Sequence, residues 1–177
     1  MTKEGDYIVR RKTYTFRKRR IVEVEEFHDG RYGHPGGKRK PRGKPTPEQA
    51  AIINHQNKVK RCRHKLLEYF SPGDTFITLT YEKRNRPPTM KEAIAHFGKF
   101  IRKVKAEYRK RGQELRWIRN IEQGTKGAWH IHLVVNEIGD TASIIKRGWE
   151  KGGIYAEQIR LSDKVYDEDF SKLAAYM

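Results

Sequence analysis

The sequence has a single cysteine, Cys62, among its 177 residues. One cysteine excludes an internal disulfide and any zinc site built on paired CxxC motifs, and it fits a reducing cytoplasm. The sequence also has no run of the roughly 18–20 apolar residues that a spanning helix needs and no signal peptide at its start, so we expect no membrane insertion. Acidic residues are few, because 22 Asp and Glu stand against 39 Lys and Arg, for a formal net charge of +17. That excess indicates a polyanionic partner.

We divide the chain into a basic N-terminal extension, residues 1–70, and a core, residues 71–177. The extension is predicted to contain, in order, a β-hairpin around a basic turn, a loop rich in Gly, Pro, Lys and Arg, and a basic helix with a capping box at its start. These three parts are residues 7–27, 28–45 and 46–69. The loop reads either as a solvated linker or as an arm that orders on phosphates. We expect the extension to pack on the core.

From residue 74 onward, alternation and capping signals predict the order strand, helix, strand, strand, helix, strand, followed by a last helix. The strands are expected at residues 74–81, 114–122, 128–136 and 154–161, and the helices at 89–112, 140–152 and 167–177. This order matches the ferredoxin-like split βαβ unit, an α+β fold with a central antiparallel sheet of about five strands and helices on one face. The metal site and the last helix are expected at the other, open face. In the first of these helices the predicted buried stripe is Ile94, Phe97, Ile101, Val104 and Tyr108.

Two histidines lie one residue apart in the strand 128–136. Alternation turns Trp129 and Ile131 toward the helices, and it turns His130 and His132 toward the open face. The residues of neighbouring strands that share this face are Thr78, Thr80, Asn120 and Glu122. If the hairpin pairs Glu122 with His130, the two imidazoles and the carboxylate can converge on one ion, whereas a shift of one residue would put Glu122 on the wrong face. Such a set suits a borderline divalent cation with open positions for a substrate oxygen. The H-x-H pair alone would be explained equally well by surface histidines, and it is Glu122 together with the high positive charge that favours a metal site.

Three segments resemble, in order, the motifs of the HUH endonucleases, especially the rolling-circle replication initiators of plasmids and single-stranded DNA phages. FITLTY (76–81) resembles the first motif. HIH, within EQGTKGAWHIHLVVN (122–136), resembles the His-hydrophobic-His motif, and Glu122 stands where the family has its third ligand. KLAAYM (172–177) resembles the start of the third motif, which makes Tyr176 the nucleophile. Without the resemblance, Tyr176, one of nine tyrosines, would be interpreted as a packing residue.

The resemblance implies a replication initiator that nicks and rejoins single-stranded DNA at a replication origin through a 5′-phosphotyrosine intermediate. It implies Mn²⁺ or Mg²⁺ at Glu122, His130 and His132, a ligand set that would also accept Zn²⁺, and no small-molecule cofactor. The expected partners are single-stranded or hairpin DNA of the origin and the host replication machinery, including a helicase because the sequence has no phosphate-binding GxxxxGK[ST] motif. The expected location is the cytoplasm, on DNA. The predicted DNA-binding residues are Thr78, Thr80, Lys83, Arg84, Arg86, Asn120 and Lys126.

The sequence ends one residue after Tyr176, so the lysine that follows the tyrosine in the family's third motif is absent. We therefore expect the chain to be the N-terminal part of a longer protein. The alternatives are a single-tyrosine transposase or mobilisation relaxase, and a non-catalytic single-stranded nucleic-acid-binding module whose H-x-H pair is incidental or holds a structural metal. Relaxases usually carry the tyrosine near the N-terminus, ahead of a three-histidine cluster, and this sequence has the opposite order.

Overall fold

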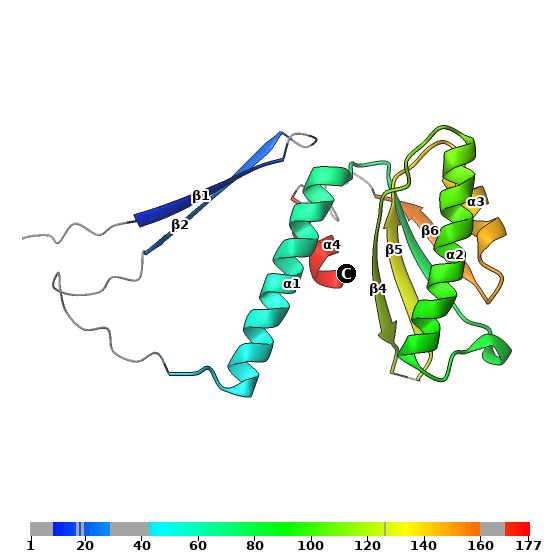
Figure 1. The fold of residues 1–177 in the computed structure, drawn as a ribbon, viewed down its shortest axis with the longest axis horizontal. Helices are drawn as coiled ribbons and strands as arrows, with labels where there is room; N and C mark the ends of the chain where they lie inside the picture. The colour runs from blue at the N-terminus through cyan, green and yellow to red at the C-terminus, as the bar shows by residue number, and fades with distance from the viewer. Residues whose placement is uncertain (1–8, 17, 19, 29–42, 126, 160–168) are drawn as a thin grey trace, which may run out of the picture.

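The structure is a computed structural model that describes all residues except 1–8, 17, 19, 29–42, 126 and 160–168 (Figure 1). Its elements in chain order are β1 (Val9–Phe16), β2 (Ile21–His28), α1 (Pro47–Tyr69), β3 (Thr75–Thr80), the 3-10 turn η1 (Lys83–Asn85), α2 (Met90–Lys110), β4 (Trp117–Gln123), β5 (Trp129–Val135), α3 (Thr141–Gly148), β6 (Ile154–Gln158) and α4 (Ser171–Tyr176). The predicted order of strands and helices is confirmed. Most of the predicted basic loop, residues 28–45, lies outside the described residues.

The central sheet has the strand order β4-β5-β3-β6, and every neighbouring pair is antiparallel. In this order the first strand of the unit, β3, is flanked by the third and the fourth, which is the topology of the split βαβ fold. The predicted fold class is therefore confirmed. The expected count of about five strands is wrong for the described residues, because the sheet has four and β1 and β2 form a separate two-stranded sheet. The hairpin packs on α1, which stands between it and the central sheet (Figure 1).

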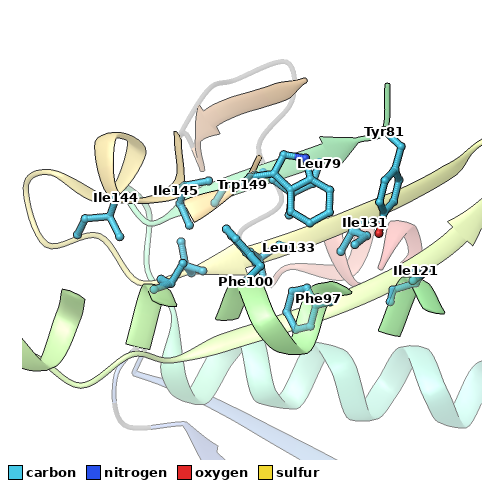
Figure 2. Close-up of a cluster of buried hydrophobic side chains, with 14 of the residues drawn as sticks. Leu79, Tyr81, Phe97, Phe100, Ile121, Ile131, Leu133, Ile144, Ile145 and Trp149 are labelled. Carbon is cyan, nitrogen blue, oxygen red and sulfur yellow. The ribbon is translucent and has the colours of Figure 1, made fainter. Parts of the chain in front are cut away.

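Helices α2 and α3 cover one face of the sheet and enclose the main hydrophobic core (Figure 2). The predicted stripe of α2 is partly wrong: Ala93 and Phe100 are buried, whereas Ile94 is 43% exposed. The cause lies in α3, where a Cβ added at Gly148 would come within 3.2 Å of the Phe100 ring. A glycine at this point lets the two helices approach closely enough to enclose Phe100.

The opposite face of the sheet is covered at one end by α4 and the C-terminal part of α1. Sheet residues Phe76 and Val134 are buried there in a second cluster. The other members of this cluster are Phe16 from β1, Leu66 and Leu67 from α1, Phe70, and Phe170, Ala174 and Met177 at the two ends and in the middle of α4. Burying a leucine side chain contributes about 1.5–3 kcal/mol, so this cluster is what holds the two helices on the sheet. The half of the face that carries Thr80 and His130 lies beyond it.

The predicted helix starts are also confirmed. Thr46 and Gln49 form a reciprocal capping box at the start of α1, and the Thr89 hydroxyl accepts a hydrogen bond from the Glu92 amide at the start of α2. Within the part of the chain that the structure describes, no helix is both long enough and apolar enough to cross a membrane. The division into an extension and a core at residue 70 stays a prediction.

Candidate active site

The strand register brings the predicted site residues into two adjacent rows on the sheet face opposite α2 and α3. One row holds Asn120, His132, Thr78 and Tyr155, and the next holds Glu122, His130 and Thr80. The predicted pairing of Glu122 with His130 is confirmed. Because side chains of directly opposed residues point to the same face, both histidines and the carboxylate share it.

His132 is the centre of this arrangement and is only 3% exposed. Its Nε2 lies 2.8 Å from Glu122 Oε1, and its Nδ1 lies 3.1 Å from the Thr78 hydroxyl. A neutral imidazole has one donor and one acceptor nitrogen. The geometry therefore fits a tautomer in which Nε2–H donates to Glu122 and Nδ1 accepts from Thr78, which fixes the ring at both ends.

His130 lies beside His132, with ring centroids 6.5 Å apart and planes at 18°. In this side-chain arrangement, no group of three or more His, Cys, Asp and Glu among the described residues is close enough to hold a metal ion. Two imidazoles and a carboxylate are nevertheless the ligand types that suit a borderline divalent cation. The Glu122 side chain is 49% exposed, so its carboxylate is not locked by packing. The three residues fit such a cation in type and in shared face, and binding would replace the Glu122–His132 hydrogen bond.

Tyr176, the last residue of α4, lies against the histidine row. Its ring meets His132 edge-on, with centroids 4.9 Å apart, and meets Phe76 at 5.8 Å. Phe170 and Ala174 anchor the helix in the second cluster. Tyr176 itself is 55% exposed, unlike these anchors, so its side chain is open to a substrate while it touches the site.

Other tyrosines are less suited to act as nucleophiles. Burial raises the pKa of both Tyr81 and Tyr108 to about 12, which disfavours the phenolate. The Tyr108 hydroxyl also donates to the Asn136 carbonyl at 2.6 Å. Tyr155 is 60% exposed on the site face, but its strand, β6, is two strands away from that of His132, about 10 Å at the usual strand spacing.

The predicted DNA-binding residues fall into two groups. Thr78 contacts His132 as described, Asn120 is half-buried opposite His132, and the Thr80 hydroxyl donates to the Gly153 carbonyl at 3.2 Å. The basic residues Lys83, Arg84 and Arg86 are exposed in and after η1, at the end of β3 that carries Thr80. Arg84 pairs with Glu82 at 3.0 Å, and within the described residues no hydrogen bond or ion pair joins the three basic residues to the histidines. Lys126 lies outside the described residues.

The prediction from sequence missed two aromatic residues on the site face. Phe76 packs under both His132 and Tyr176, with ring centroids 6.1 and 5.8 Å away. Tyr155 stands opposite Thr78 and is largely exposed. The alternation that exposed the histidines also assigns both residues to this face, because Phe76 has the parity of Thr78 and Tyr155 the opposite parity to the inward Ile154.

A family model described as the replication-associated protein family of ORF2 and the gene 2 protein matches residues 74–177, the segment that contains the central sheet, the histidine pair and Tyr176. No curated protein and no solved structure gave a significant match.

Proposed function

Because the chain belongs to the replication-associated protein family of ORF2 and the gene 2 protein, we propose that it initiates rolling-circle replication by nicking and rejoining single-stranded DNA at an origin. Family membership supports a role in DNA replication, and with it binding to DNA. The formal charge of +17 is consistent with a polyanionic substrate. The nicking chemistry is the part that goes beyond the family.

The observation that carries the proposal is the meeting of three elements at His132. Glu122 from β4 bonds to this histidine, and Tyr176 from α4 lies edge-on to its ring with centroids 4.9 Å apart. A hydroxyl nucleophile beside a set of ligand-type side chains, in a face open to solvent, is an arrangement suited to phosphoryl transfer.

In the proposed reaction, the Tyr176 oxygen loses its proton to water and attacks the scissile phosphorus. A bond forms between this oxygen and phosphorus, and the bond between phosphorus and the 3′ oxygen of the preceding nucleotide breaks. The 3′ oxygen takes a proton from water and leaves as a free hydroxyl, while the 5′ side remains on Tyr176. The phosphodiester energy is kept in the tyrosyl ester, so a 3′ hydroxyl that attacks it rejoins the strand without ATP.

Glu122, His130 and His132 would hold a divalent cation, Mn²⁺ or Mg²⁺ in this proposal, with Zn²⁺ as another ion that the ligand set accepts. Such an ion, when bound, supplies positive charge to a non-bridging phosphate oxygen. Thr78 holds the His132 ring through Nδ1, and such supporting contacts orient ligating histidines.

The DNA strand is proposed to cross the open half of the sheet. Thr80 and Asn120 would contact it beside the histidines, and the exposed cations after β3, together with Lys126 in the hairpin loop, would contact its phosphates. These cations are Lys83, Arg84 and Arg86. Tyr155, exposed two strands from His132, would stack on a base next to the cleaved position. Unwinding would fall to a host helicase.

The test is a covalent-adduct assay with a 5′-labelled and a 3′-labelled single-stranded origin oligonucleotide, Mn²⁺ and denaturing gel electrophoresis. We expect the label on the 3′ side of the nick to migrate with the wild-type protein and the Tyr176→Phe variant to form no adduct. Tyr155→Phe is the matched control, because it removes a hydroxyl from the other exposed tyrosine of this face, and it should form the adduct normally. A Tyr176→Phe protein that still forms the adduct would contradict the assignment. Binding without any adduct by the wild type would instead favour the non-catalytic binding module.

A further inference from the structure

Helix α1 is longer than the part of it that is packed. Its C-terminal residues Leu66 and Leu67 are buried in the second cluster, whereas every residue from Ala51 to Lys58 is exposed. Figure 1 shows these N-terminal turns standing clear of the hairpin and of the central sheet. A surface helix usually buries one apolar face along its length, so packing within this chain does not account for the first half of α1.

The basic residues of α1 divide into two faces. On one face, Lys60 pairs with Glu25 and Arg63 pairs with Glu23, which fastens the β1–β2 hairpin to the helix. His64 also lies 3.2 Å from Glu23. The hairpin therefore neutralises this face.

The other face of α1 keeps its charge. Lys58, Arg61 and Lys65 are all exposed, and none of the three has an acidic partner among the described residues. Together with Asn54 they follow spacings of four, three and four residues, which places them on one side of a helix. The result is a polar and positive stripe, Asn54, Lys58, Arg61 and Lys65, that begins in the turns that contact nothing else.

We propose that this stripe is a binding site for duplex DNA, separate from the site around His132. The 23 residues of α1 span about 35 Å, close to one turn of duplex DNA. The major groove admits an α-helix. The three cations would contact phosphates, and Asn54, in the exposed turns, would reach base edges. The chain would then hold a duplex segment through α1 while single-stranded DNA occupies the sheet, and the duplex site stands whether or not Tyr176 is the nucleophile.

The experiment compares two triple variants that lose the same charge. The test variant carries Lys58→Ala, Arg61→Ala and Lys65→Ala. The control carries Lys99→Ala, Arg102→Ala and Lys105→Ala, three exposed cations of α2 on the far side of the sheet that have no acidic partner among the described residues. Binding of a mixed-sequence duplex of about 20 base pairs, two helical turns, and of a single strand of the same length is measured by fluorescence anisotropy over a series of salt concentrations.

The slope of log K against log salt for the duplex should fall by about 0.9 for each lost phosphate contact, hence by about 2.7 in the α1 variant. The α2 variant should keep the wild-type slope, and the α1 variant should keep wild-type binding of the single strand. Each single substitution should remove about one third of the slope change, which keeps the test valid if the triple variant folds poorly. Equal losses in both triple variants would overturn the proposal, since they would reflect overall charge alone. An equal loss of single-strand binding in the α1 variant would also overturn it.

The two proposals fail separately. An α1 variant that forms the covalent adduct on a single-stranded oligonucleotide but no longer binds the duplex supports the duplex site and leaves the tyrosine chemistry intact. A wild type that forms no adduct but shows the expected α1-dependent duplex binding contradicts only the proposed nicking.

Discussion

Replacing Thr78 with valine removes the hydroxyl that meets His132 Nδ1 at 3.1 Å and leaves a side chain of nearly the same shape. The imidazole is 3% exposed, so water cannot easily replace the lost partner. A buried acceptor left without a hydrogen bond costs about 1–3 kcal/mol, and we expect the free energy of unfolding to fall by that amount. Loss of a residue that orients a ligating histidine typically weakens metal affinity about 10–100-fold. The Mn²⁺ concentration that gives half-maximal adduct formation should therefore rise at least tenfold.

The assays for Thr78→Val are urea unfolding and adduct formation over a series of Mn²⁺ concentrations. Thr80→Val is the matched control, because this threonine lies on the same strand and face but donates to the Gly153 carbonyl at 3.2 Å. The control should keep the wild-type dependence on Mn²⁺. If the two variants show the same unfolding free energy and the same Mn²⁺ dependence, the Thr78 hydroxyl does not position His132 and the reasoning is refuted.

Three further predictions concern stability and DNA binding. Burial acts to raise the pKa of Glu137, but hydrogen bonds from the Thr75 hydroxyl and backbone amides outweigh it and the pKa is lowered. Its contribution to stability is therefore present at neutral pH and lost as the pH falls through the lowered value, so Glu137→Gln should flatten the acid loss of unfolding free energy in urea titrations; an unchanged slope would contradict this. Leu67→Ala should lower the unfolding free energy by about 2–5 kcal/mol, because Leu67 of α1 is fully buried; a cost like that of an exposed residue would disprove the docking of α1. Tyr155→Ala should weaken single-strand binding by about 1–3 kcal/mol while Tyr155→Trp retains it, and equal anisotropy curves for both variants would exclude stacking.

The local pattern predicted the site strands well, for a physical reason. Alternation with a period of two assigns His130 and His132 to one face whatever the rest of the chain does. A short connection of the β4–β5 hairpin leaves few registers, and the observed pairing of Glu122 with His130 is the expected one. Capping at Thr46 and Thr89 also depends on neighbours within three residues, so both helix starts could be predicted.

Features that depend on contacts between distant segments could not be predicted in the same way. The burial of Phe100 in place of Ile94 follows from the approach of α3 at Gly148, and the periodicity of α2 alone does not contain that contact. The contact of Tyr176 with His132 joins α4 to β5 through packing on Phe76. Sequence alone provided no distance between these elements, and only the family resemblance singled out this tyrosine.

Peptide mapping of the covalent adduct tests the central claim most directly. The wild-type protein is incubated with the single-stranded oligonucleotide and Mn²⁺, digested with nuclease and trypsin, and examined by tandem mass spectrometry. The account predicts a 5′-phosphonucleotide on Tyr176, in the tryptic peptide that begins at Leu173. A nucleotide on Tyr155 or on any other residue, or the absence of a nucleotide-bearing peptide under conditions in which the DNA is cut, would contradict it.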